Sequence, residues 1–369
     1  MESFLSFGHQ ALGFIALLTV LVFVHEWGHY IIARINGVRV EVFSIGFGPE
    51  IWGFDDKNGT RWKFSWIPLG GYVKFFGDAS EASTPGSNLT AMTEAEKKVS
   101  FHHKKLSQRA AIVFAGPAVN FLFAILILAG MFYTYGRVII APVVGEVLEN
   151  SAASEAGMLP GDRIISIDGQ KITGFRQIKE HLYFKVQDDV AIDVNRDGTL
   201  MTLNFTLKMI EEKDMLGQTN NVRQIGISAS RDNYEIIKYG PIESFGQSII
   251  QTKNLTERNL QGLWQIIVGD RSAKELGGPI TIARVAGKAA EAGFVEWINI
   301  AALISISLGM INLFPIPMLD GGHLLFYAIE AIRGRKLSEN AQEYGFRIGL
   351  ALVLSLMIFA TVVDIEKIL

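Results

Sequence analysis

The residues of this chain most able to do chemistry are His25, Glu26 and His29, which form an HExxH pattern. On a helix, residues i and i+4 share a face, so the two imidazoles can bind one metal ion. The carboxylate of Glu26, next to His25, can then take a proton from a water molecule at that ion. The pattern therefore predicts a metal centre that activates water.

The setting of the pattern argues against a chance match. HExxH fixes only three positions, and paired histidines on the surface helix of a soluble protein are common and idle. Here an apolar run at residues 11–24 leads into the pattern, and residues 30–33 continue it. A carboxylate at mid-membrane costs roughly 2.5 to 3.5 kcal/mol, so a helix without a use for one rarely keeps it. A structural zinc is the alternative, but such sites usually take four protein ligands, often cysteines, and the chain has no cysteine.

Four stretches of the chain are long and apolar enough to cross a bilayer. Hydrophobic residues make up 49% of the 369 residues, and the mean hydropathy is +0.27, which is too apolar for an ordinary soluble enzyme. The stretches are residues 11–32, residues 110–135, a segment from residue 298 past Asn312, and residues 348–363. We therefore expect a polytopic α-helical membrane protein with four transmembrane helices.

Basic residues set the expected orientation of these helices, because positively charged loops stay on the cytoplasmic side. The loop after the first helix carries Arg34, Arg39, Lys97, Lys98, Lys104, Lys105 and Arg109. The loop before the fourth helix carries Arg333, Arg335 and Lys336. The N-terminal segment has no basic residue, and only Arg137 closely follows the second helix. Residues 34–109 are therefore expected inside, and residues 137–296 and both termini outside.

A catalytic zinc usually takes three protein ligands and a water, so HExxH lacks one ligand. Asp320 is the best candidate, because it is an isolated carboxylate in an apolar segment that Pro315 and Pro317 interrupt. Counting 1.5 Å per residue places His25 about 21 Å into the membrane and the end of the third helix about 24 Å in. His25 and Asp320 are thus expected at similar depth, in the cytoplasmic half of the bilayer. The alternative is an ordinary helix-terminal aspartate, with His323 as the ligand instead.

Between the second and third apolar stretches the chain changes character. Residues 137–231 alternate like short strands around a helix, with Asp-Gly turns at residues 168–169 and 197–198. They predict a small α+β domain whose strand edge could bind an extended peptide, although a spacer without a ligand fits the same periodicity. Residues 232–296 have apolar residues at helical spacing and predict an amphipathic helical connector, lying on the membrane or on the domain.

The loop between the first two helices holds two strand-like pieces with glycines, at residues 43–49 and 67–75. They are too apolar for a solvated loop and too short to span a bilayer. This favours a hairpin that dips into the membrane near the metal. Plain cytoplasmic strands are the alternative.

Several motifs together resemble the site-2 protease family of intramembrane zinc proteases. They are HExxH, Gly-Phe-Gly at residues 46–48, Pro-Leu-Gly-Gly-Tyr-Val-Lys at residues 68–74, Ala-Gly-Pro-Ala-Val-Asn at residues 115–120, and Asn-x-x-Pro-x-x-x-x-Asp-Gly at residues 312–321. The inserted α+β domain is similar to a PDZ domain in its Ala-Gly-Met-x-x-Gly-Asp-Arg-Ile stretch. Well-known members of the family carry two tandem PDZ domains, whereas one fits between Val138 and about residue 230.

The resemblance implies roles for individual residues. His25, His29 and Asp320 would bind Zn2+, and Glu26 would be the general acid/base. Asn312 would help to hold the substrate. The glycines of a membrane-associated hairpin that helps to present the substrate would be Gly46, Gly48, Gly70 and Gly71.

The resemblance also implies the partners and the location. The substrates would be single-span membrane proteins, such as an anti-sigma factor or a remnant signal peptide, cut in regulated intramembrane proteolysis. The enzyme would lie in the bacterial inner membrane with its PDZ-like domain in the periplasm, where it would bind peptide termini. Nothing in the sequence indicates a nucleic-acid partner.

The sequence divides into four expected parts. A membrane part with the HExxH helix and the hairpin occupies residues 1–136, the PDZ-like domain residues 137–231, the connector residues 232–296, and the Asp-bearing membrane part residues 297–369. Two other functions compete with the protease. A non-catalytic PDZ scaffold predicts a broken motif, yet the four key residues are intact. A metal transporter predicts further polar residues along a continuous path, and the sequence shows none between the sites.

Overall fold

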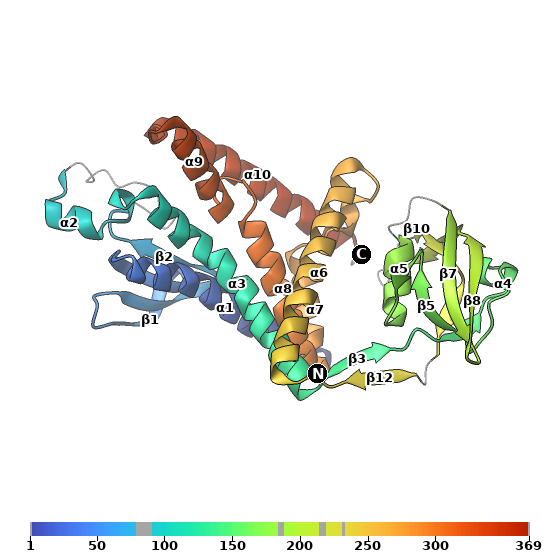
Figure 1. The fold of residues 1–369 in the computed structure, drawn as a ribbon. Helices are drawn as coiled ribbons and strands as arrows, with labels where there is room; N and C mark the ends of the chain where they lie inside the picture. Colours follow the sequence, from blue (N-terminus) through green and yellow to red (C-terminus); the bar gives the residue numbers. More distant parts are fainter. Residues whose placement is uncertain (1, 79–90, 184–187, 214–218, 231–232, 368–369) are drawn as a thin grey trace. The chain divides into compact units, whose positions relative to one another are not determined.

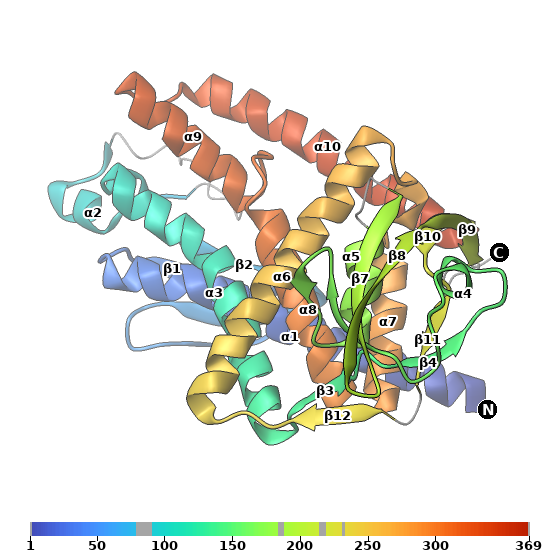
Figure 2. The same cartoon turned by 45° about the vertical axis from the view of Figure 1, so that its right-hand side comes forward.

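The computed structural model describes residues 2–78, 91–183, 188–213, 219–230 and 233–367. These residues form two compact units (Figure 1, Figure 2). The helical unit comprises Met1–Gly130 and Pro241–Leu369, and the inserted unit comprises Met131–Gly240.

Among its described residues, the helical unit holds four helices long and apolar enough to cross a membrane. They lie in α1 (Glu2–Ile35), α3 (Leu106–Thr134), α8 (Phe294–Asn312) and α10 (Glu339–Glu366). The four expected helices are thus confirmed. α10 begins earlier than the expected residue 348, because the hydroxyl of Ser338 caps its first turn by accepting the N–H of Ala341 at 3.4 Å.

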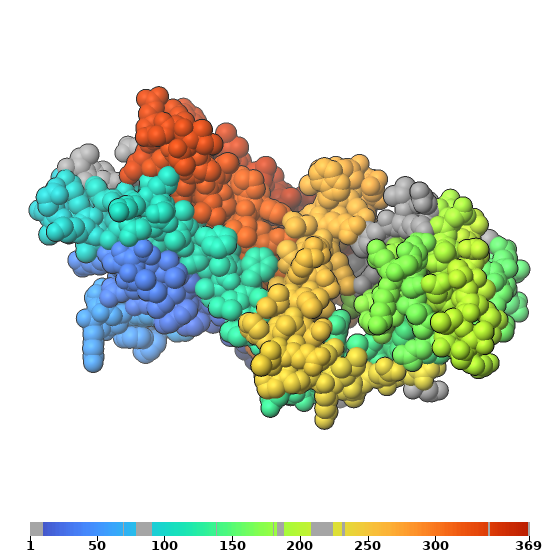
Figure 3. Space-filling view, in the orientation of Figure 1, coloured from blue at the N-terminus to red at the C-terminus, as the bar shows by residue number. Residues whose placement is uncertain are grey.

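Shorter elements complete the helical unit. They are β1 (Val40–Asp55), β2 (Arg61–Phe75), α2 (Glu94–Val99), η2 (Phe101–His103), α6 (Pro241–Val268), η3 (Ala273–Glu275), α7 (Pro279–Ala292) and α9 (Asp320–Arg333). α6 buries the small polar side chains of Ser244, Ser248 and Thr252 and exposes large apolar ones such as Ile242 and Trp264. Figure 3 shows α6 at the surface of the helical unit itself. This distribution suits a helix whose outer side meets lipid rather than water.

Close contact between α1 and α3 brings the HExxH pattern against a second helix. A Cβ atom on Gly28 would lie 2.5 Å from the carbonyl oxygen of Ala115, so the two backbones meet where glycine leaves room. Leu17 and Leu21 of α1 belong to a buried cluster that includes Ala301 of α8. The first three expected membrane helices therefore pack together around the pattern.

The chain turns back sharply between α8 and α9. α8 ends at Asn312, and the two prolines that follow lack the N–H that would continue it. Gly321, in the first turn of α9, has no room for a side chain, because a Cβ atom there would overlap the carbonyl oxygens of Leu313 and Phe314. α9 therefore packs tightly onto the end of α8, with Asp320 as its first residue. From the sequence, a helix terminus at Asp320 was expected only as an alternative, and no bounds were predicted for this helix.

β1 and β2 curl into a sheet in which the first part of β1 is central. Residues 40–45 pair with residues 71–75 on one side, and residues 42–45 pair with residues 61–64 on the other, where both residue numbers rise together. Residues 50–55 pair with residues 61–65 from the outside. Residues 71–75 thus form an edge that pairs with no other strand in the described part of the chain.

This edge of the sheet lies against α1, beside the HExxH pattern. A Cβ atom on Gly71 would lie 2.7 Å from Cγ1 of Val22 and 3.3 Å from Cγ of Glu26, so the strand can approach only as glycine. The central strand also contacts α1, because Phe43 is buried with Tyr30 of α1 in one hydrophobic cluster. The hairpin is therefore fixed to the helix that carries the pattern.

The inserted unit has the expected α+β fold. Its central sheet has the strand order β6-β5-β7-β8, and two further strand pairs are β4–β11 and β9–β10. Its elements are β4 (Val144–Val147), α4 (Ala152–Glu155), β5 (Arg163–Ile167), β6 (Gln170–Lys171), α5 (Phe175–Tyr183), β7 (Asp189–Arg196), β8 (Thr199–Thr206), β9 (Lys208–Lys213), β10 (Thr219–Gln224) and β11 (Ile227–Ala229). The two Asp-Gly turns join β5 to β6 and β7 to β8, and all four of their residues have positive φ, as a two-residue hairpin turn requires.

The unit has its own core and strands that the sequence did not suggest, among them β9, β10 and one further pair. Ile164, Ile167 and Ile192 of β5 and β7 pack with Ile178 of α5 in a buried cluster. β3 (Arg137–Ile140) pairs antiparallel with β12 (Tyr234–Ile237). The two strands have four residues each and lie at opposite ends of the unit's sequence. Such short, distant strands leave no local signal, which is why they were missed.

Candidate metal centre

The structure brings together His25 and His29 of α1 and Asp320 of α9. One donor atom of each lies within 4.8 Å of the others, the one such metal-compatible group found among the described residues. Nε2 of His25 lies 3.2 Å from Nε2 of His29 and 3.2 Å from Oδ2 of Asp320. Nε2 of His29 lies 3.5 Å from Oδ1 of Asp320. His323, the alternative ligand, is outside this group.

These three spacings fit one tetrahedral zinc ion. Two ligand atoms about 2.05 Å from zinc at a tetrahedral angle lie about 3.3 Å apart. Two imidazole nitrogens and a carboxylate are also a donor set that catalytic zinc sites use. Oδ2 of Asp320 is buried and has no hydrogen-bond partner in the described structure, a state that a bound cation would relieve.

A backbone carbonyl fixes the tautomer of His29. Its Nδ1 lies 2.9 Å from the carbonyl oxygen of Ile112 in α3. A carbonyl oxygen only accepts, so Nδ1 carries the proton and Nε2 presents a lone pair toward Asp320. Hydrogen bonds of this kind orient metal-binding histidines.

The second histidine has an amide as its partner. Nδ2 of Asn120 lies 3.1 Å from Nδ1 of His25, and Oδ1 of the same amide is buried without a partner in the described structure. A 180° rotation of the amide exchanges its oxygen and nitrogen. Oδ1 then accepts the Nδ1 proton of His25 and leaves Nε2 free for a metal. The residues present therefore fit zinc in both rings.

A glycine of α3 makes room for both imidazoles. A Cβ atom on Gly116 would overlap Nε2 of His29 and lie 2.9 Å from Cε1 of His25. Gly116 and Asn120 had no expected role of their own, although both lie in the Ala-Gly-Pro-Ala-Val-Asn motif. A fully buried asparagine in an apolar helix is the signal that could have singled out Asn120, because such a group needs a partner.

Glu26 lies at the same cavity as the three donors. Its side chain is buried and lies against the edge strand, where a Cβ atom on Gly71 would come within 3.3 Å of its Cγ. The cavity has a volume of about 570 Å³ and is also lined by His323 and Met318. A carboxylate beside the donors and in contact with a strand edge is placed to exchange protons with a bound peptide group.

The structure places some of the residues expected to contact substrate at the cavity and others away from it. Asn312, Gly70 and Gly71 line the cavity, and the Asn312 amide lies 3.4 Å from Nε2 of His25. Gly46 and Gly48 do not line it; the side chain of Phe47 between them does. Both glycines have positive φ, 92° and 89°, so they shape the turn that carries Phe47.

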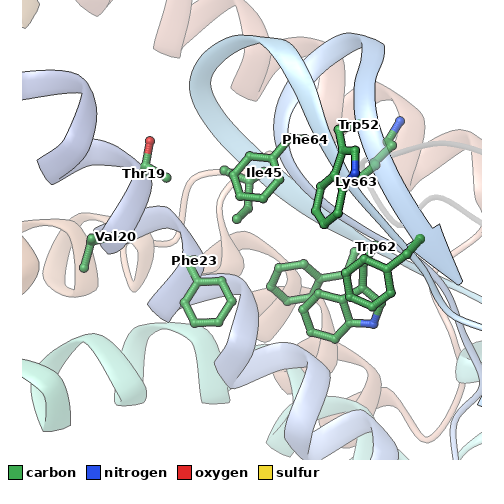
Figure 4. A pocket seen from close by; sticks show the side chains of 10 residues that line it. Thr19, Val20, Phe23, Ile45, Trp52, Trp62, Lys63 and Phe64 are labelled. Atoms are coloured by element: carbon green, nitrogen blue, oxygen red, sulfur yellow. The ribbon is translucent and has the colours of Figure 1, made fainter. Parts of the chain in front are cut away.

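A second, smaller pocket of about 290 Å³ lies between α1 and the hairpin. Figure 4 shows aromatic and aliphatic side chains around it, including Phe23, Trp52, Trp62 and Phe64, whereas the amine of Lys63 points away. Thr19 and Lys63 are its polar lining residues, and no histidine or carboxylate is among the described residues that line it. It is therefore a separate apolar feature of the hairpin.

Known proteins resemble the chain along most of its length. The family model described as "Peptidase family M50" matches residues 13–356. A Rhizobium meliloti (strain 1021) protein that bears the provisional name zinc metalloprotease is 45% identical over 356 residues, 96% of this chain and 95% of that protein. Metalloprotease MmpA of Caulobacter vibrioides is 35% identical over 377 residues, 95% of this chain and 94% of that protein.

A solved structure matches a smaller part. The PDZ domain of the SdrC-like protein from Listeria monocytogenes is 24% identical, with a TM-score of 0.20, and the match covers 27% of this chain and 93% of that one. Family membership rests on the match of residues 13–356 and on the relatives above. The chain belongs to peptidase family M50, the site-2 proteases, and is an integral membrane zinc metalloprotease.

Proposed function

We propose that this enzyme cuts peptide bonds within the transmembrane segments of single-span membrane proteins. The observation that carries the proposal is the meeting of His25, His29 and Asp320 among helices long and apolar enough to cross a membrane. Hydrolysis at that depth requires a substrate that is itself in the membrane. The intact HExxH pattern and the family of the chain favour this function over a scaffold or a metal transporter.

His25, His29 and Asp320 are the proposed zinc ligands, and their donor spacings of 3.2 to 3.5 Å support this. When bound, zinc supplies a Lewis acid and a water of lowered pKa. Ile112 and Asn120 hold the two rings so that each Nε2 points at Asp320.

Glu26 is the proposed general acid/base. Its carboxylate takes the proton of the attacking water and passes it to the nitrogen of the leaving peptide. The amide of Asn312, which lines the same cavity, can donate to the oxygen of the scissile carbonyl as negative charge develops there. The bilayer around the enzyme excludes water, so water must reach the cavity through the protein. The irregular segment between α8 and α9 is the proposed route, because non-helical backbone at membrane depth can line a water-filled cavity.

The hairpin edge is the proposed substrate platform. A peptide bond inside a regular helix is shielded, so the substrate must unwind near the site. Residues 71–75 form a strand edge next to Glu26, and an unwound segment can pair with such an edge. Gly70 and Gly71 line the cavity directly, while Gly46 and Gly48 act through the turn around Phe47.

The finer cellular assignments belong to the same proposal. The enzyme lies in a bacterial inner membrane, with its termini and the PDZ-like domain in the periplasm and the metal centre in the cytoplasmic half of the bilayer. Its substrates are of the anti-sigma factor or remnant signal peptide class, and the PDZ-like domain binds peptide termini. The proposed parts are residues 1–136, 137–231, 232–296 and 297–369. The basic loops and the chain's resemblance to site-2 proteases support these assignments.

The test compares the wild type with Glu26→Gln in liposomes that contain a single-span model substrate. We expect Glu26→Gln to retain one zinc per chain by metal analysis and to lose cleavage. Glu257→Gln, at the exposed residue on α6 that pairs with Lys253, is the control and should keep both. Cleavage by Glu26→Gln at the wild-type rate would refute the catalytic role. Cleavage only outside the membrane segment, located by mass spectrometry of the products, would refute intramembrane proteolysis.

A further inference from the structure

The β3–β12 ribbon is fixed directly to the end of a membrane helix. α3 ends at Thr134 and β3 begins at Arg137, with Gly136 between them at a φ of 74°. A Cβ atom on Gly136 would lie 2.8 Å from Cγ2 of Ile236, so β12 packs onto this turn. Phe132, in the last turn of α3, also lies 6.3 Å from the ring of Tyr239.

The ribbon lies within reach of the membrane boundary. A residue spans at most about 3.6 Å, so Arg137 begins no more than about 11 Å from the end of the helix. Figure 1 shows β3 and β12 side by side as a narrow pair of strands. A ribbon tied so closely to the end of a membrane helix must lie near the interface on that side.

The two faces of the ribbon differ. Tyr234 pairs with Ile140, and Ile236 follows two residues later, so their side chains share one face. Tyr234 is 58% exposed and Ile236 60% exposed. Glu235 and Ile139 pair on the other face.

That other face is turned toward the rest of the inserted unit. Glu235 lies 3.7 Å from Arg163 of β5. A Cβ atom on Gly174 would lie 2.8 Å from Cγ2 of Ile139. The face with Tyr234 and Ile236 is thus apolar, whereas the face with Glu235 contacts the rest of the unit and carries the charge, with the Glu235 side chain 51% exposed.

Neighbouring side chains match the layers of a bilayer surface. Tyr133 and Tyr135, at the end of α3, are each 55% exposed, and tyrosines gather at the boundary between headgroups and acyl chains. Lys238 directly follows β12 and is exposed, and an ammonium group there suits the phosphate layer of a bilayer surface. Apolar side chains, tyrosines and a cation near the end of one membrane helix are typical of an interfacial anchor.

We propose that the β3–β12 ribbon is a membrane-surface anchor whose open face, Tyr234 and Ile236, inserts at the boundary of headgroups and acyl chains. Its partner is the phospholipid bilayer itself. β3 and β12 are the segments by which the chain enters and leaves the inserted unit, so both connections are then held at the membrane surface. This inference requires a membrane helix at α3 but not the proposed cleavage reaction.

The absence of cysteine from the chain allows a direct test. Single cysteines replace Ile236, Tyr234 or Glu235 in the full chain, and each carries a nitroxide label in phosphatidylethanolamine–phosphatidylglycerol liposomes. Collision rates with oxygen, which concentrates in lipid, and with a water-soluble nickel complex report the depth of each label. Leu126→Cys on the exposed side of α3 is the lipid reference, and Asp197→Cys in the exposed β7–β8 turn is the water reference.

We expect a ratio of oxygen to nickel collisions severalfold higher at positions 234 and 236 than at position 235. The alternation keeps the test valid if one variant is poorly folded. Ratios at 234 and 236 equal to that at 197 would overturn the proposal. Labels at positions 234 and 236 could instead be shielded from both reagents. If that shielding weakens when the protein is diluted in lipid, a second protein copy covers this face, and the proposal is overturned.

Discussion

The side-chain amide of Asn120 lies 3.1 Å from Nδ1 of His25, on the opposite side of the ring from Asp320. An imidazole that binds a metal through Nε2 must carry its proton on Nδ1, and that proton needs an acceptor. As placed, Nδ2 of Asn120 faces Nδ1 of His25 and Oδ1 has no partner in the described structure, so a 180° rotation of the amide supplies the acceptor. Asn120 is therefore the group that sets which nitrogen of His25 is free.

Asn120→Ala should weaken zinc binding without removing a ligand. Loss of a hydrogen bond to a metal-binding histidine typically costs about 10- to 100-fold in metal affinity. Competition with a zinc-binding dye measures the change in the purified protein. Ser305→Ala is the control, because Ser305 donates to the backbone carbonyl of Asn120 at 2.8 Å and not to its side-chain amide. Equal affinity in Asn120→Ala and the wild type would show that His25 needs no such partner.

Gly116→Ala should displace both histidines. The added methyl group would overlap Nε2 of His29 and approach Cε1 of His25 to 2.9 Å, so α3 must move away from α1 or the rings must turn. We expect a zinc content well below one per chain and no cleavage. Gly130→Ala is the matched control in the same helix, because a Cβ atom there meets nothing within 4 Å. Full zinc content in Gly116→Ala would mean that the rings do not occupy the positions described.

The sequence sufficed for the parts of the site that depend on local spacing. HExxH on a helix aligns two imidazoles, and the lone carboxylate in a broken apolar segment singles out Asp320. The structure brings the side chains of His25, His29 and Asp320 together. Their role as ligands stays a prediction until zinc is measured. The long apolar runs likewise sufficed for the four helices.

Contacts between distant segments could not be predicted in the same way. Asn120 and His25 are 95 residues apart, and their contact depends on how closely α1 and α3 approach at Gly28. The pairing of residues 42–45 with strand segments on both sides also has no signature in alternation alone. α9 was missed because two glycines, Gly321 and Gly322, directly follow Asp320 in its first turn. A pair of glycines is typical of a turn when the sequence is read alone.

The position of the hairpin in the bilayer is open to a fluorescence test. Trp52 and Trp66 are 59% and 68% exposed, which suits side chains in lipid but not in water. In liposomes of brominated lipid, which quenches tryptophan on contact, we expect strong quenching, and the variant Trp52→Phe/Trp66→Phe should lose the hairpin's share of it while Trp264 on α6 keeps its own. Trp264→Phe, at the exposed tryptophan of α6, controls for the loss of one indole. Quenching of Trp52 and Trp66 by iodide in water, but not by bromine, would favour the plain cytoplasmic strands instead.

The inserted unit should lose stability in acid through one buried carboxylate. Asp162 is 1% exposed and accepts two 2.7 Å hydrogen bonds from the Arg196 guanidinium and one of 2.8 Å from the N–H of Leu159. Burial alone would raise the pKa of Asp162, but these bonds outweigh it and hold the pKa below its ordinary value. A lowered pKa in the folded state means that the carboxylate stabilises the fold above the ordinary value of about 3.9. That stabilisation is lost as the pH falls through the lower, folded value.

Asp162→Asn should therefore destabilise the inserted unit by about 1 to 3 kcal/mol at pH 7, since it weakens a charge-assisted pair and leaves buried donors poorly matched. Hydrogen exchange of β5 and β7 in the full chain, compared with the wild type at the same pH, measures the difference and cancels the intrinsic pH dependence of exchange. The difference should be constant from pH 7 to pH 5 and shrink below pH 4, where the wild type also loses its charge. Asp197→Asn, in the exposed β7–β8 turn with a φ of 51° that asparagine tolerates, is the matched control and should change little. A difference between Asp162→Asn and the wild type that persists unchanged to pH 2 would show that the shape of the side chain, and not its charge, stabilises the unit.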